Sequence, residues 1–423
     1  MMIPLDQAQG IVLDSVSPLP IDVTPIDQAL GCVLGQTVYA VNDVPSFRNS
    51  SMDGYALRSD DTKGAPVTLQ IVGSVSAGHV FAGTLAPGQA VRIMTGAPIP
   101  NGADAVSMVE LCEPNDDDDT VVVTTEIPAG NFIRHPGYDV AAGDVLALAG
   151  TTLRPAHLGV LGAQGIGTVP VHRRPRLGVL STGDELFVDD GPLPPGRIRD
   201  ANRHSLLGLI REEGWEPVDL GVVPDDRGAL LEAFGRAAES CDALITSGGV
   251  SVGDFDIVRI VLDDVSGGSM RWMQVAIRPA KPFAFGTLAQ TNLPVFGLPG
   301  NPVSAMVSFE LLVRPAVRRM AGHTNLFQAL VSATSTVDLA RVPDGRIHFV
   351  RGHVSLDGEG HYFARPLEDQ ESHQLNAMAN ANALLILPDG RGVAQGTPVR
   401  ALLFYPADVT ELSDDQSTGG AGS

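Results

Sequence analysis

The chain has 423 residues, 44% of them hydrophobic and 18% charged, which is enough for two to four domains with sizeable cores. Its formal net charge is −21, and this acidity disfavours non-specific binding to nucleic acid or to an anionic membrane. An anionic ligand therefore has to be held by local features, such as loop amides, a few basic side chains or a metal ion.

The cysteine pattern and the N-terminal sequence both predict a cytoplasmic protein. Cys32, Cys112 and Cys241 are scattered without a C-x-x-C pair, so neither a zinc knuckle nor a disulfide framework is predicted. The first ten residues lack a basic region followed by an apolar run, and no stretch of about 18 apolar residues predicts a membrane span. We expect neither nucleic acid nor a membrane as a partner.

The N-terminal part of the chain predicts helical, turn and β segments in succession. Residues 1–44 read as helix and turn, whereas residues 45–130 are rich in glycine and valine with frequent turn residues, which is typical of a small β domain. The acidic run at 115–119 predicts a solvated hairpin tip. A calcium loop is the alternative there, although the ligand spacing and glycine of an EF-hand are missing. Pro155 at a first turn predicts a helix over 154–167.

Residues 173–322 show the clearest pattern in the chain, an alternation of strands and helices. This alternation predicts an α/β domain with a parallel sheet that is covered on both faces. Residues 323–410 return to short strands and predict a second small β domain, while 411–423 predict a disordered tail. The α/β strands are expected at 176–182, 216–223, 242–249, 283–288 and 295–300, and the helices at 201–214, 227–240, 255–265 and 301–322.

Three glycine-rich loops follow strands of this sheet, at the edge where parallel sheets bind ligands. They are STGDEL, SGGVSVGDFD and GLPGNPVSA. Hydroxyls and backbone N–H groups in such loops can hold a phosphate, and Asn301 is placed to begin a helix whose amino end favours an anion. An ordinary βα turn is the alternative for each loop. The candidate substrate-binding residues are Ser181, Thr182, Gly183, Ser247, Gly248, Gly249, Ser251, Gly253, Pro299, Gly300, Asn301 and Ser304.

Carboxylates follow the same strands. Oxygen ligands of this kind suit Mg²⁺, which bridges protein carboxylates and substrate phosphates. A divalent ion between two negative groups would explain why a phosphate-holding loop ends in acid. Asp226 fits the N-cap of the next helix as well as it fits a metal ligand. The carboxylates are Asp184, Glu185, Asp225, Asp226, Asp254 and Asp256.

Arg278 and Lys281 form another candidate anion site, in a segment that precedes a strand. Prolines at 279 and 282 exclude a helix there. Two cations on a stiff loop suit a phosphate or an oxyanion, and a solvated turn is the alternative. The segment at 45–58, PSFRNSSMDGYALR, predicts only a structural hairpin from its periodicity.

Taken together, six motifs resemble the molybdopterin molybdenumtransferase family, to which the E domain of gephyrin is related. The resemblance extends from about residue 3 to about residue 408. Its motifs, in chain order, are PSFRNSSMDGYALR, RIMTGAPIPNGADAVSMVE, RPRLGVLSTGDEL, ITSGGVSVGDFD, RPAKPFAFG and GLPGNPVSA.

The resemblance implies a fold of four domains and an elongated homodimer. Residues 1–44 and 131–172 would form a discontinuous linking and dimerisation domain, and the active cleft would lie between the α/β domain of one subunit and parts of the other. The implied reaction is Mg²⁺-dependent insertion of molybdate into adenylylated molybdopterin, which releases AMP and molybdenum cofactor. Molybdopterin adenylyltransferase is the implied upstream partner.

The resemblance also assigns residues to the site. Glu185, Asp225 and Asp256 would hold Mg²⁺ at the phosphoanhydride, where the ion neutralises charge developing on the leaving AMP. Arg351 and Ser372, in the C-terminal β domain, match positions implicated in the same site. The matches to active-site positions are Asp53, Thr95, Glu185, Asp225 and Asp256.

The sequence departs from the family pattern at four positions. Gln274 and Arg278 stand where some members have lysine, Ala280 replaces the usual glycine, and Tyr138 stands where an acid is usual. None of these changes removes a proposed metal ligand. Two alternatives stay open: a non-catalytic gephyrin-like scaffold that binds a cytoskeletal or cell-division protein, and a tungstate-specific paralogue.

Overall fold

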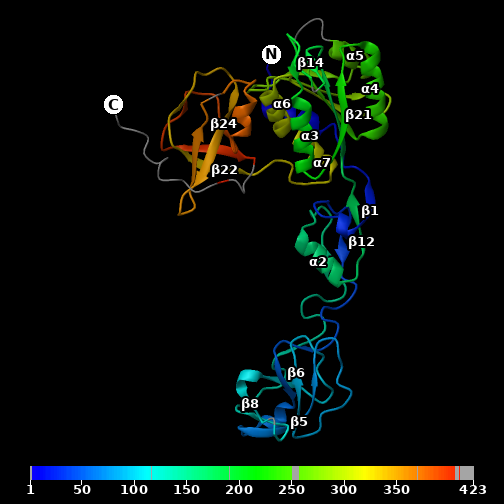
Figure 1. The fold of residues 1–423 in the computed structure, drawn as a ribbon, viewed down its shortest axis with the longest axis vertical. Helices are drawn as coiled ribbons and strands as arrows, with labels where there is room; N and C mark the ends of the chain where they lie inside the picture. The colour runs from blue at the N-terminus through cyan, green and yellow to red at the C-terminus, as the bar shows by residue number, and fades with distance from the viewer. Residues whose placement is uncertain are drawn as a thin grey trace. The chain divides into compact units, whose positions relative to one another are not determined.

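The computed structural model describes residues 2–115, 117–189, 191–249, 257–368, 370–404 and 409. Contacts within it divide the chain into two units (Figure 1). Unit 1 comprises Met1–Asp22, Gly31–Gly35 and Val171–Ser423, and unit 2 comprises Val23–Leu30 and Gln36–Pro170. The finer domain boundaries expected from the sequence stay predictions. Within the described ranges, no helix is long and apolar enough to cross a membrane.

A six-stranded sheet forms the centre of the α/β domain in unit 1, in the order β16-β13-β17-β21-β20-β18. The first four strands are parallel, as predicted, whereas β20 and β18 are antiparallel to their neighbours. Only residues 289–292 join β20 to β21, which is too short for the crossover that a parallel pair requires. The strands are β13 (Arg176–Thr182), β16 (Glu216–Val223), β17 (Ala243–Ser247), β18 (Arg271–Gln274), β20 (Pro282–Leu288) and β21 (Leu293–Leu298), and β14 (Leu186–Phe187) pairs with β15 (Ile198–Arg199) beside them.

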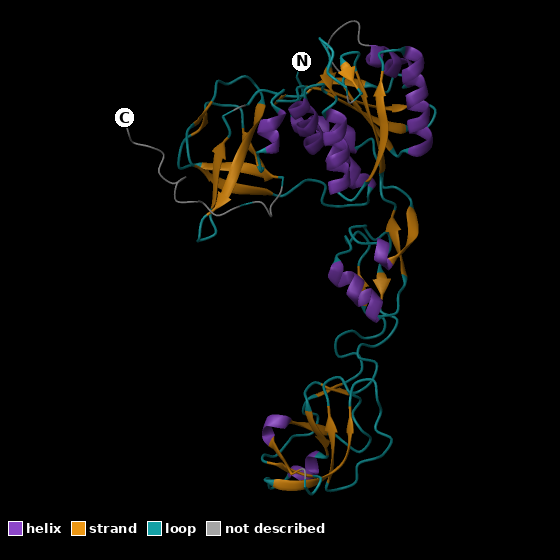
Figure 2. Ribbon diagram, in the orientation of Figure 1, coloured by secondary structure: helices purple, strands orange, loops and turns teal. Residues whose placement is uncertain are grey.

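Helices cover both faces of this sheet (Figure 2), as the strand–helix alternation predicts. Leu180 and Leu244 point to one face and share a core with α4 and α5, while the adjacent Val179 and Ile245 point to the other face and share a core with α1, α3, α6 and α7. Alternate residues of each strand are thus buried on opposite faces. The predicted fold class is confirmed. The helices are α1 (Leu5–Leu13), α3 (Asn202–Glu212), α4 (Arg227–Ser240), α5 (Ile257–Val265), α6 (Pro302–Ser308) and α7 (Arg314–Met320).

The long helix predicted over 301–322 is continuous, but its centre, Phe309–Val313, is π-helical. Pro315 has no N–H to donate to the carbonyl of Leu311, and its ring crowds that carbonyl. The side chain of Gln9, on α1, supplies the missing donor: its Nε2 donates to Leu311 O at 2.9 Å. The N-terminal helix therefore satisfies a backbone group that the proline leaves open.

A buried ion-pair network follows in the same helix. Arg314 Nη2 donates to Glu310 Oε1 at 2.8 Å, and Arg314 Nη1 donates to Glu213 Oε1, at the end of α3, at 2.5 Å. Arg318 Nη1 reaches Glu213 Oε2 at 3.3 Å. The side chain of Glu310 is 1% exposed and that of Arg314 7% exposed, so these charges are shielded from water and depend on one another.

We expect Arg314→Ala to lower the free energy of unfolding by about 3–5 kcal/mol, because removing one member of a buried pair leaves the other charge without a partner. Urea unfolding followed by circular dichroism measures this loss. Arg236→Ala is the matched control, because its partner Glu232 is 78% exposed and surface pairs contribute about 0–1 kcal/mol. A loss for Arg314→Ala no larger than that of the control would contradict the expectation.

The C-terminal β domain of unit 1 is a small closed sheet. Its strands run in the order β24-β25-β22-β28-β26, and β26 pairs back with β24 to close the ring. β19, which comes from the α/β part of the sequence, adds to the outside of β24. The elements are β19 (Ile277–Arg278), β22 (Leu330–Ser335), β23 (Leu339–Ala340), β24 (Ile347–Leu356), β25 (Tyr362–Pro366), α8 (Leu375–Ala379), β26 (Ala383–Leu387), β27 (Gly392–Val393) and β28 (Pro398–Leu403).

Unit 2 contains a six-stranded sheet in the order β7-β4-β6-β5-β9-β8. A side chain at Gly54 would meet the carbonyl oxygen of Ser107 at 1.8 Å, so the close approach of β7 to β4 requires glycine there. β8 and β9 pair antiparallel on either side of the acidic run. The main elements are β4 (Gly54–Leu57), β5 (Val67–Val75), β6 (Gln89–Ile93), β7 (Ala105–Met108), β8 (Cys112–Asn115), β9 (Thr120–Val123) and α2 (Pro155–Ala163); the short strands are β2 (Val38–Tyr39), β3 (Asn49–Ser50), β10 (Ile133–Arg134) and β11 (Val145–Ala147), and β1 (Ile21–Pro25) pairs with β12 (Thr168–His172).

Candidate functional site

Side chains at the start of α3 join the three predicted loops at the carboxyl edge of the parallel strands. Ser181, at the end of β13, donates to Asp200 Oδ1 at 3.1 Å. Asn202 Nδ2 lies 2.7 Å from Ser247 Oγ, at the end of β17, and 2.7 Å from the carbonyl oxygen of Gly300, after β21. Residues predicted from three separate segments are therefore brought into one hydrogen-bonded group.

The sequence analysis missed Asp200 and Asn202. The carboxylate of Asp200 also accepts from Arg203 N at 3.1 Å and from Arg203 Nε at 3.0 Å, and Arg203 pairs in turn with Asp219 on β16. Because both of its carboxylate oxygens already accept hydrogen bonds, Asp200 holds the end of β13 against the start of α3. The only signal in the sequence was a polar D-A-N run at the start of a predicted helix, which is also typical of an ordinary helix start.

Gly183 brings the carboxylate of Glu185 back over the end of β13. Gly183 has a φ of +144°, and a Cβ placed on it would lie 2.5 Å from Glu185 Oε2. The positive φ strains any other residue at this position, and a Cβ there would displace the flexible carboxylate of Glu185. The backbone N–H of Leu186 closes the turn by donating to the carbonyl of Gly183 at 3.1 Å.

The remaining carboxylates of this edge divide into two kinds. Asp225 is exposed, and its N–H approaches Asp184 Oδ1 at 3.4 Å. Asp226 caps α4, because its Oδ1 accepts from Ala229 N at 2.9 Å. The alternative left open for Asp226 is thus decided in favour of the helix cap.

The magnesium prediction concerns Glu185, Asp225 and Asp256. Asp256 lies outside the described residues, as do Asp254, Ser251 and Gly253. Among the residues with described positions, no three histidine, cysteine, aspartate or glutamate side chains gather closely enough to hold a metal. Glu185 and Asp225 are nonetheless exposed oxygen donors at one strand edge, and no basic side chain of the described part pairs with Glu185. This donor chemistry fits a hard divalent ion.

The loop after β17 begins with two residues in the left-handed region, Gly248 (φ +98°) and Gly249 (φ +72°). The N–H of Gly248 donates to the carbonyl of Leu298, at the end of β21, at 3.1 Å. A Cβ at Gly248 would lie 2.8 Å from the carbonyl oxygen of Thr182, so the ends of β13, β17 and β21 approach one another closely. Glycine is needed here both for conformation and for space.

The C-terminal domain reaches this edge through Ser372. Asn301 is the N-cap residue of α6, but its side chain does not cap the helix. Instead Asn301 Nδ2 donates to Ser372 Oγ at 2.9 Å, and Val303 N donates to the carbonyl of Ser372 at 3.2 Å. Pro299 and Ser304, also predicted in this loop, are buried.

Arg351 supports the segment that carries Ser372. Its side chain is fully buried, and its Nη2 donates to the carbonyl of Glu371 at 3.2 Å. Gln370 binds the backbone of Arg351 on both sides, at 3.0 Å to its N–H and 2.9 Å to its carbonyl. Two predicted site residues, far apart in sequence, are thereby linked through one loop.

Arg278 is held by the C-terminal sheet. It pairs with His348 in the parallel register of β19 and β24, and its side chain is exposed. Lys281 closes the loop, because its carbonyl accepts from Val275 N at 2.7 Å. Ala280 between them has a φ of +74° and is buried, so this alanine occupies a conformation that suits the glycine usual in the family. The segment is not helical, as predicted.

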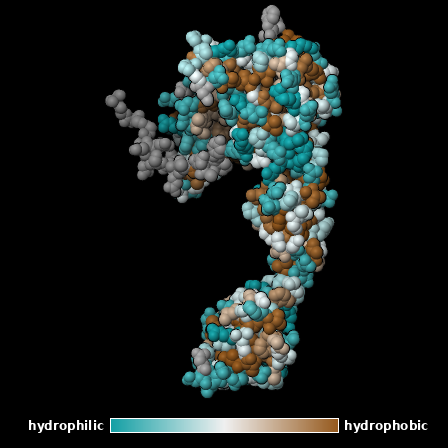
Figure 3. Space-filling model, turned by 45° about the vertical axis from the view of Figure 1, so that its right-hand side comes forward, coloured by the Kyte–Doolittle hydropathy of each residue, from teal (hydrophilic) through white to brown (hydrophobic). Residues whose placement is uncertain are grey.

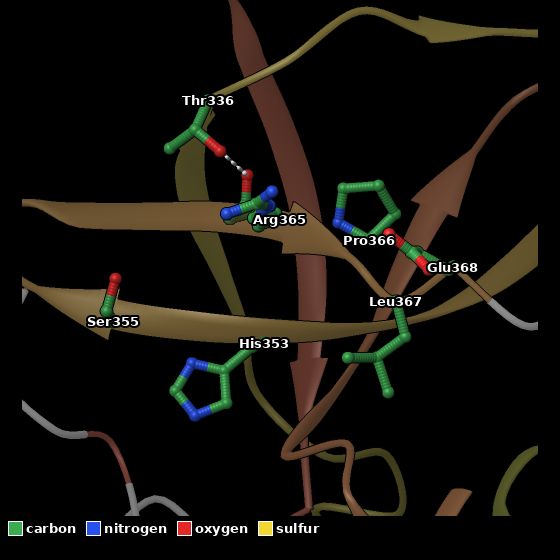
Figure 4. A pocket seen from close by; sticks show the side chains of 8 residues that line it. Thr336, His353, Ser355, Arg365, Pro366, Leu367 and Glu368 are labelled. Atoms are coloured by element: carbon green, nitrogen blue, oxygen red, sulfur yellow. Dashed lines mark hydrogen bonds between the residues drawn. The ribbon is translucent and has the colours of Figure 1, made fainter. Parts of the chain in front are cut away.

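A polar cavity of about 330 Å³ lies on the same domain (Figure 4). His353 and Arg365 face each other across β24 and β25, and the hydroxyl of Thr336 donates to the carbonyl of Ala364 at 3.3 Å. None of the predicted site residues lines this cavity.

Asp53 and Thr95 lie together in unit 2. Asp53 precedes β4, Thr95 follows β6, and these strands pair antiparallel. Asp53 Oδ1 accepts from Thr95 N at 2.7 Å and from Thr95 Oγ1 at 2.8 Å. The backbone hydrogen bond and then the hydroxyl hydrogen bond of Thr95 hold the pKa of Asp53 below its ordinary value. Both side chains are exposed, which leaves the second oxygen of this ionised carboxylate accessible.

We expect Gly183→Ala to reduce the rate of the catalysed reaction at least about tenfold, because the new methyl group displaces the carboxylate of Glu185. We also expect it to lower the free energy of unfolding by about 1–3 kcal/mol through backbone strain. Steady-state kinetics and urea unfolding measure the two effects. Gly208→Ala, in α3, makes the same chemical change with no atom within 4 Å of the new Cβ, so it should be neutral or slightly stabilising. Equal kinetics for the two variants would refute the placement of Glu185.

Comparison with known proteins identifies the family of the chain. Three family models match in chain order: the MoeA N-terminal region (domain I and II) over residues 3–165, a probable molybdopterin binding domain over residues 178–319, and the MoeA C-terminal region (domain IV) over residues 333–404. The molybdopterin molybdenumtransferase of Haemophilus influenzae is 38% identical over 394 residues, which cover 92% of this chain and 96% of that relative.

The chain belongs to the molybdopterin molybdenumtransferase family. This confirms the predicted family and with it the predicted enzyme class, a transferase. Molybdopterin molybdenumtransferase 2 of Mycobacterium tuberculosis is 39% identical, with 90% of this chain and 94% of that relative covered. The crystal structure of the molybdopterin biosynthesis moeA protein from Pyrococcus horikoshii OT3 matches with a TM-score of 0.79 at 29% identity, over 96% of this chain and 100% of that one.

Proposed function

We propose that the chain inserts molybdate into adenylylated molybdopterin and releases AMP and molybdenum cofactor, with molybdopterin adenylyltransferase as the supplier of its substrate. The observation that supports this proposal most is the hydrogen-bonded group at the strand edge. Asn202 joins the ends of β17 and β21, and Asn301 joins the end of β21 to Ser372. Membership in the family supports the reaction class.

The proposed roles follow from the charges and donors at this edge. The N–H groups of the loop that follows Gly248, together with the hydroxyl of Ser247, whose oxygen accepts from Asn202, would hold and orient the pterin phosphate. Arg278 and Lys281, on a loop closed by a backbone hydrogen bond, would offset the charge of molybdate. Such local cations matter in a chain with a net charge of −21.

Glu185, Asp225 and Asp256 would hold Mg²⁺. When bound, that ion supplies electrostatic stabilisation at the phosphoanhydride. The return of the Glu185 carboxylate over Gly183 supports this assignment, since it fixes one oxygen donor at the strand edge without a competing ion pair among the described residues.

The proposal includes a homodimer in which Asp53 and Thr95 of one subunit complete the site of the other. Apolar side chains are exposed on unit 2 (Figure 3), and burying them against a second copy would favour a dimer. They lie in the segments expected to form the linking domain, and are Val23, Leu30, Tyr39, Val41, Tyr138, Val145, Leu148 and Val160.

The experiment is reconstitution with adenylylated molybdopterin, Mg²⁺ and molybdate, followed by activation of a molybdenum-free apoenzyme. We expect activation that requires both the chain and molybdate. Parallel reactions with tungstate and a tungsten-dependent apoenzyme test the paralogue alternative. Absence of turnover with either oxyanion would contradict the proposal and favour the scaffold alternative.

A further inference from the structure

The polar cavity of about 330 Å³ on the C-terminal domain lies on the outer face of its sheet. Val354 and Ala364 belong to the core of this domain, and successive side chains of a strand point to opposite faces. His353 and Ser355 of β24 and Arg365 of β25 therefore point outward, where the cavity lies (Figure 4). Its volume falls within the roughly 300–1,000 Å³ typical of small-molecule sites.

Three strands and one loop bring hydrogen-bonding side chains together around this cavity. Arg365 pairs with His353 in the antiparallel register of β25 and β24, and Thr336, directly after β22, lies beside Arg365 (Figure 4). The chain that follows β25 forms a further part of the wall through Leu367 and Glu368. The polar groups of the cavity thus come from separate segments, and the fold brings them together.

The donors in this cavity have no partners of their own. Within the part of the chain that the structure describes, the side chains of His353 and Arg365 make neither a hydrogen bond nor an ion pair. Ser355 is 6% exposed, and its hydroxyl also lacks a partner there, although its oxygen is not closed off from solvent. Buried hydroxyls are normally hydrogen-bonded. A guanidinium group, an imidazole and a hydroxyl without partners suit an oxyanion.

The cavity also contains acceptors, which narrow the chemistry of its ligand. The hydroxyl of Thr336 donates its proton to the carbonyl of Ala364 at 3.3 Å, so its oxygen can only accept from a ligand. The carboxylate of Glu368 is exposed and forms no ion pair with any described residue. A fully ionised oxyanion offers these acceptors no proton and is repelled by the carboxylate. A ligand that carries both an oxyanion and an O–H group satisfies both kinds of partner.

We propose that this cavity binds a small molecule that carries a phosphate group and an O–H donor. The guanidinium group of Arg365 holds two phosphate oxygens, because its planar fork matches their geometry. His353 and Ser355 donate to the remaining oxygens, and Glu368 accepts from the O–H group of the ligand. Inorganic phosphate, which keeps a proton at neutral pH, and a phosphate monoester with free hydroxyl groups share this chemistry.

Titration calorimetry of the full chain at neutral pH tests the site with inorganic phosphate, glycerol 3-phosphate and sulfate. At least one of the two phosphate compounds should bind saturably, and sulfate should bind at least about tenfold more weakly, because it has no proton to donate to Glu368. Tighter binding of inorganic phosphate would identify the free ion as the ligand, and tighter binding of glycerol 3-phosphate would identify an ester.

Two variants at exposed positions test the donors and the acceptor separately. Arg365→Ala should weaken binding of the phosphate compound at least about tenfold. Arg391→Ala, which removes an exposed arginine of the same domain outside the cavity, should bind as the wild type does. Glu368→Gln removes the charge that repels sulfate, so the preference for phosphate over sulfate should fall to less than about threefold.

Four results would each overturn the proposal. They are the absence of saturable phosphate binding, equal affinity of the wild type for phosphate and sulfate, an unchanged preference in Glu368→Gln, and unchanged phosphate binding by Arg365→Ala. The last result would also be seen if phosphate bound at the strand edge of the α/β domain instead, so the variant distinguishes the two places.

Discussion

Glu185→Gln should lower the rate of molybdenum cofactor formation by roughly 10²-fold or more while leaving the fold intact. Glutamine keeps the size of the side chain but removes the negative charge that a divalent ion requires. The side chain is exposed, and no basic group of the described part pairs with it, so the substitution leaves no buried charge unpaired.

The kinetics of this variant should also depend on Mg²⁺ in a characteristic way. If Glu185 is a ligand, the concentration of Mg²⁺ that gives half-maximal activity rises, and excess Mg²⁺ recovers part of the loss. Glu239→Gln is the control, since it makes the same change on the exposed surface of α4. Wild-type kinetics for Glu185→Gln at all Mg²⁺ concentrations would remove this residue from the proposed metal site.

Mixing two inactive variants, Asp53→Ala and Glu185→Ala, should restore activity. If each site takes Asp53 from one subunit and Glu185 from the other, a dimer formed from one subunit of each kind has one site with both changes and one intact site. Random reassembly makes about half of the dimers mixed, so activity should return to about a quarter of the wild-type value.

The geometry of Asp53 makes this a strong test. Thr95 holds the carboxylate through two hydrogen bonds and favours its ionised form, so alanine removes a defined charge from an exposed position and leaves the core of unit 2 unchanged. Reassembly is achieved by mild denaturation and renaturation, and each variant treated alone is the control. Activity that stays at the level of the controls would show that both residues act within one subunit, or that Asp53 is dispensable.

The fold of the α/β domain was largely predictable because its elements repeat with a regular period. The strand at 216–223 and the helix at 227–240 were predicted with the bounds that the structure shows. The bounds of such elements follow from local sequence features. These are alternating burial in the strand, an amphipathic face along the helix, and Asp226 as the helix cap.

Long-range pairing was not predictable in the same way. The segment at 45–58 was predicted to be a hairpin, which was wrong, because β3 pairs with β10, and β4 pairs with β6 and β7. Likewise, Arg278 was recognised as a candidate, but nothing in its neighbourhood shows that β19 would join the C-terminal sheet. In both cases the strand pairing depends on partner strands that are distant in the sequence.

The same difference between local and long-range features applies to the candidate site. Glycine and hydroxyl residues in the three loops were found because a functional loop and its composition lie together in the sequence. Asp200 and Asn202 were missed because their role depends on hydrogen bonds to Ser181, Ser247 and Gly300, which only the fold brings within reach. Asp226 is the opposite case: its side chain could serve as a metal ligand, but the structure shows that it caps α4.

Simultaneous measurement of AMP and molybdenum cofactor in a single reaction tests the proposed function most directly. Purified chain is mixed with adenylylated molybdopterin and Mg²⁺, molybdate is added, and both products are quantified over time. We predict that AMP and cofactor appear together in equal amounts, and that both form roughly 10²-fold more slowly, or slower still, with Glu185→Gln. Cofactor formation without AMP release, or AMP release that is indifferent to molybdate, would contradict the account.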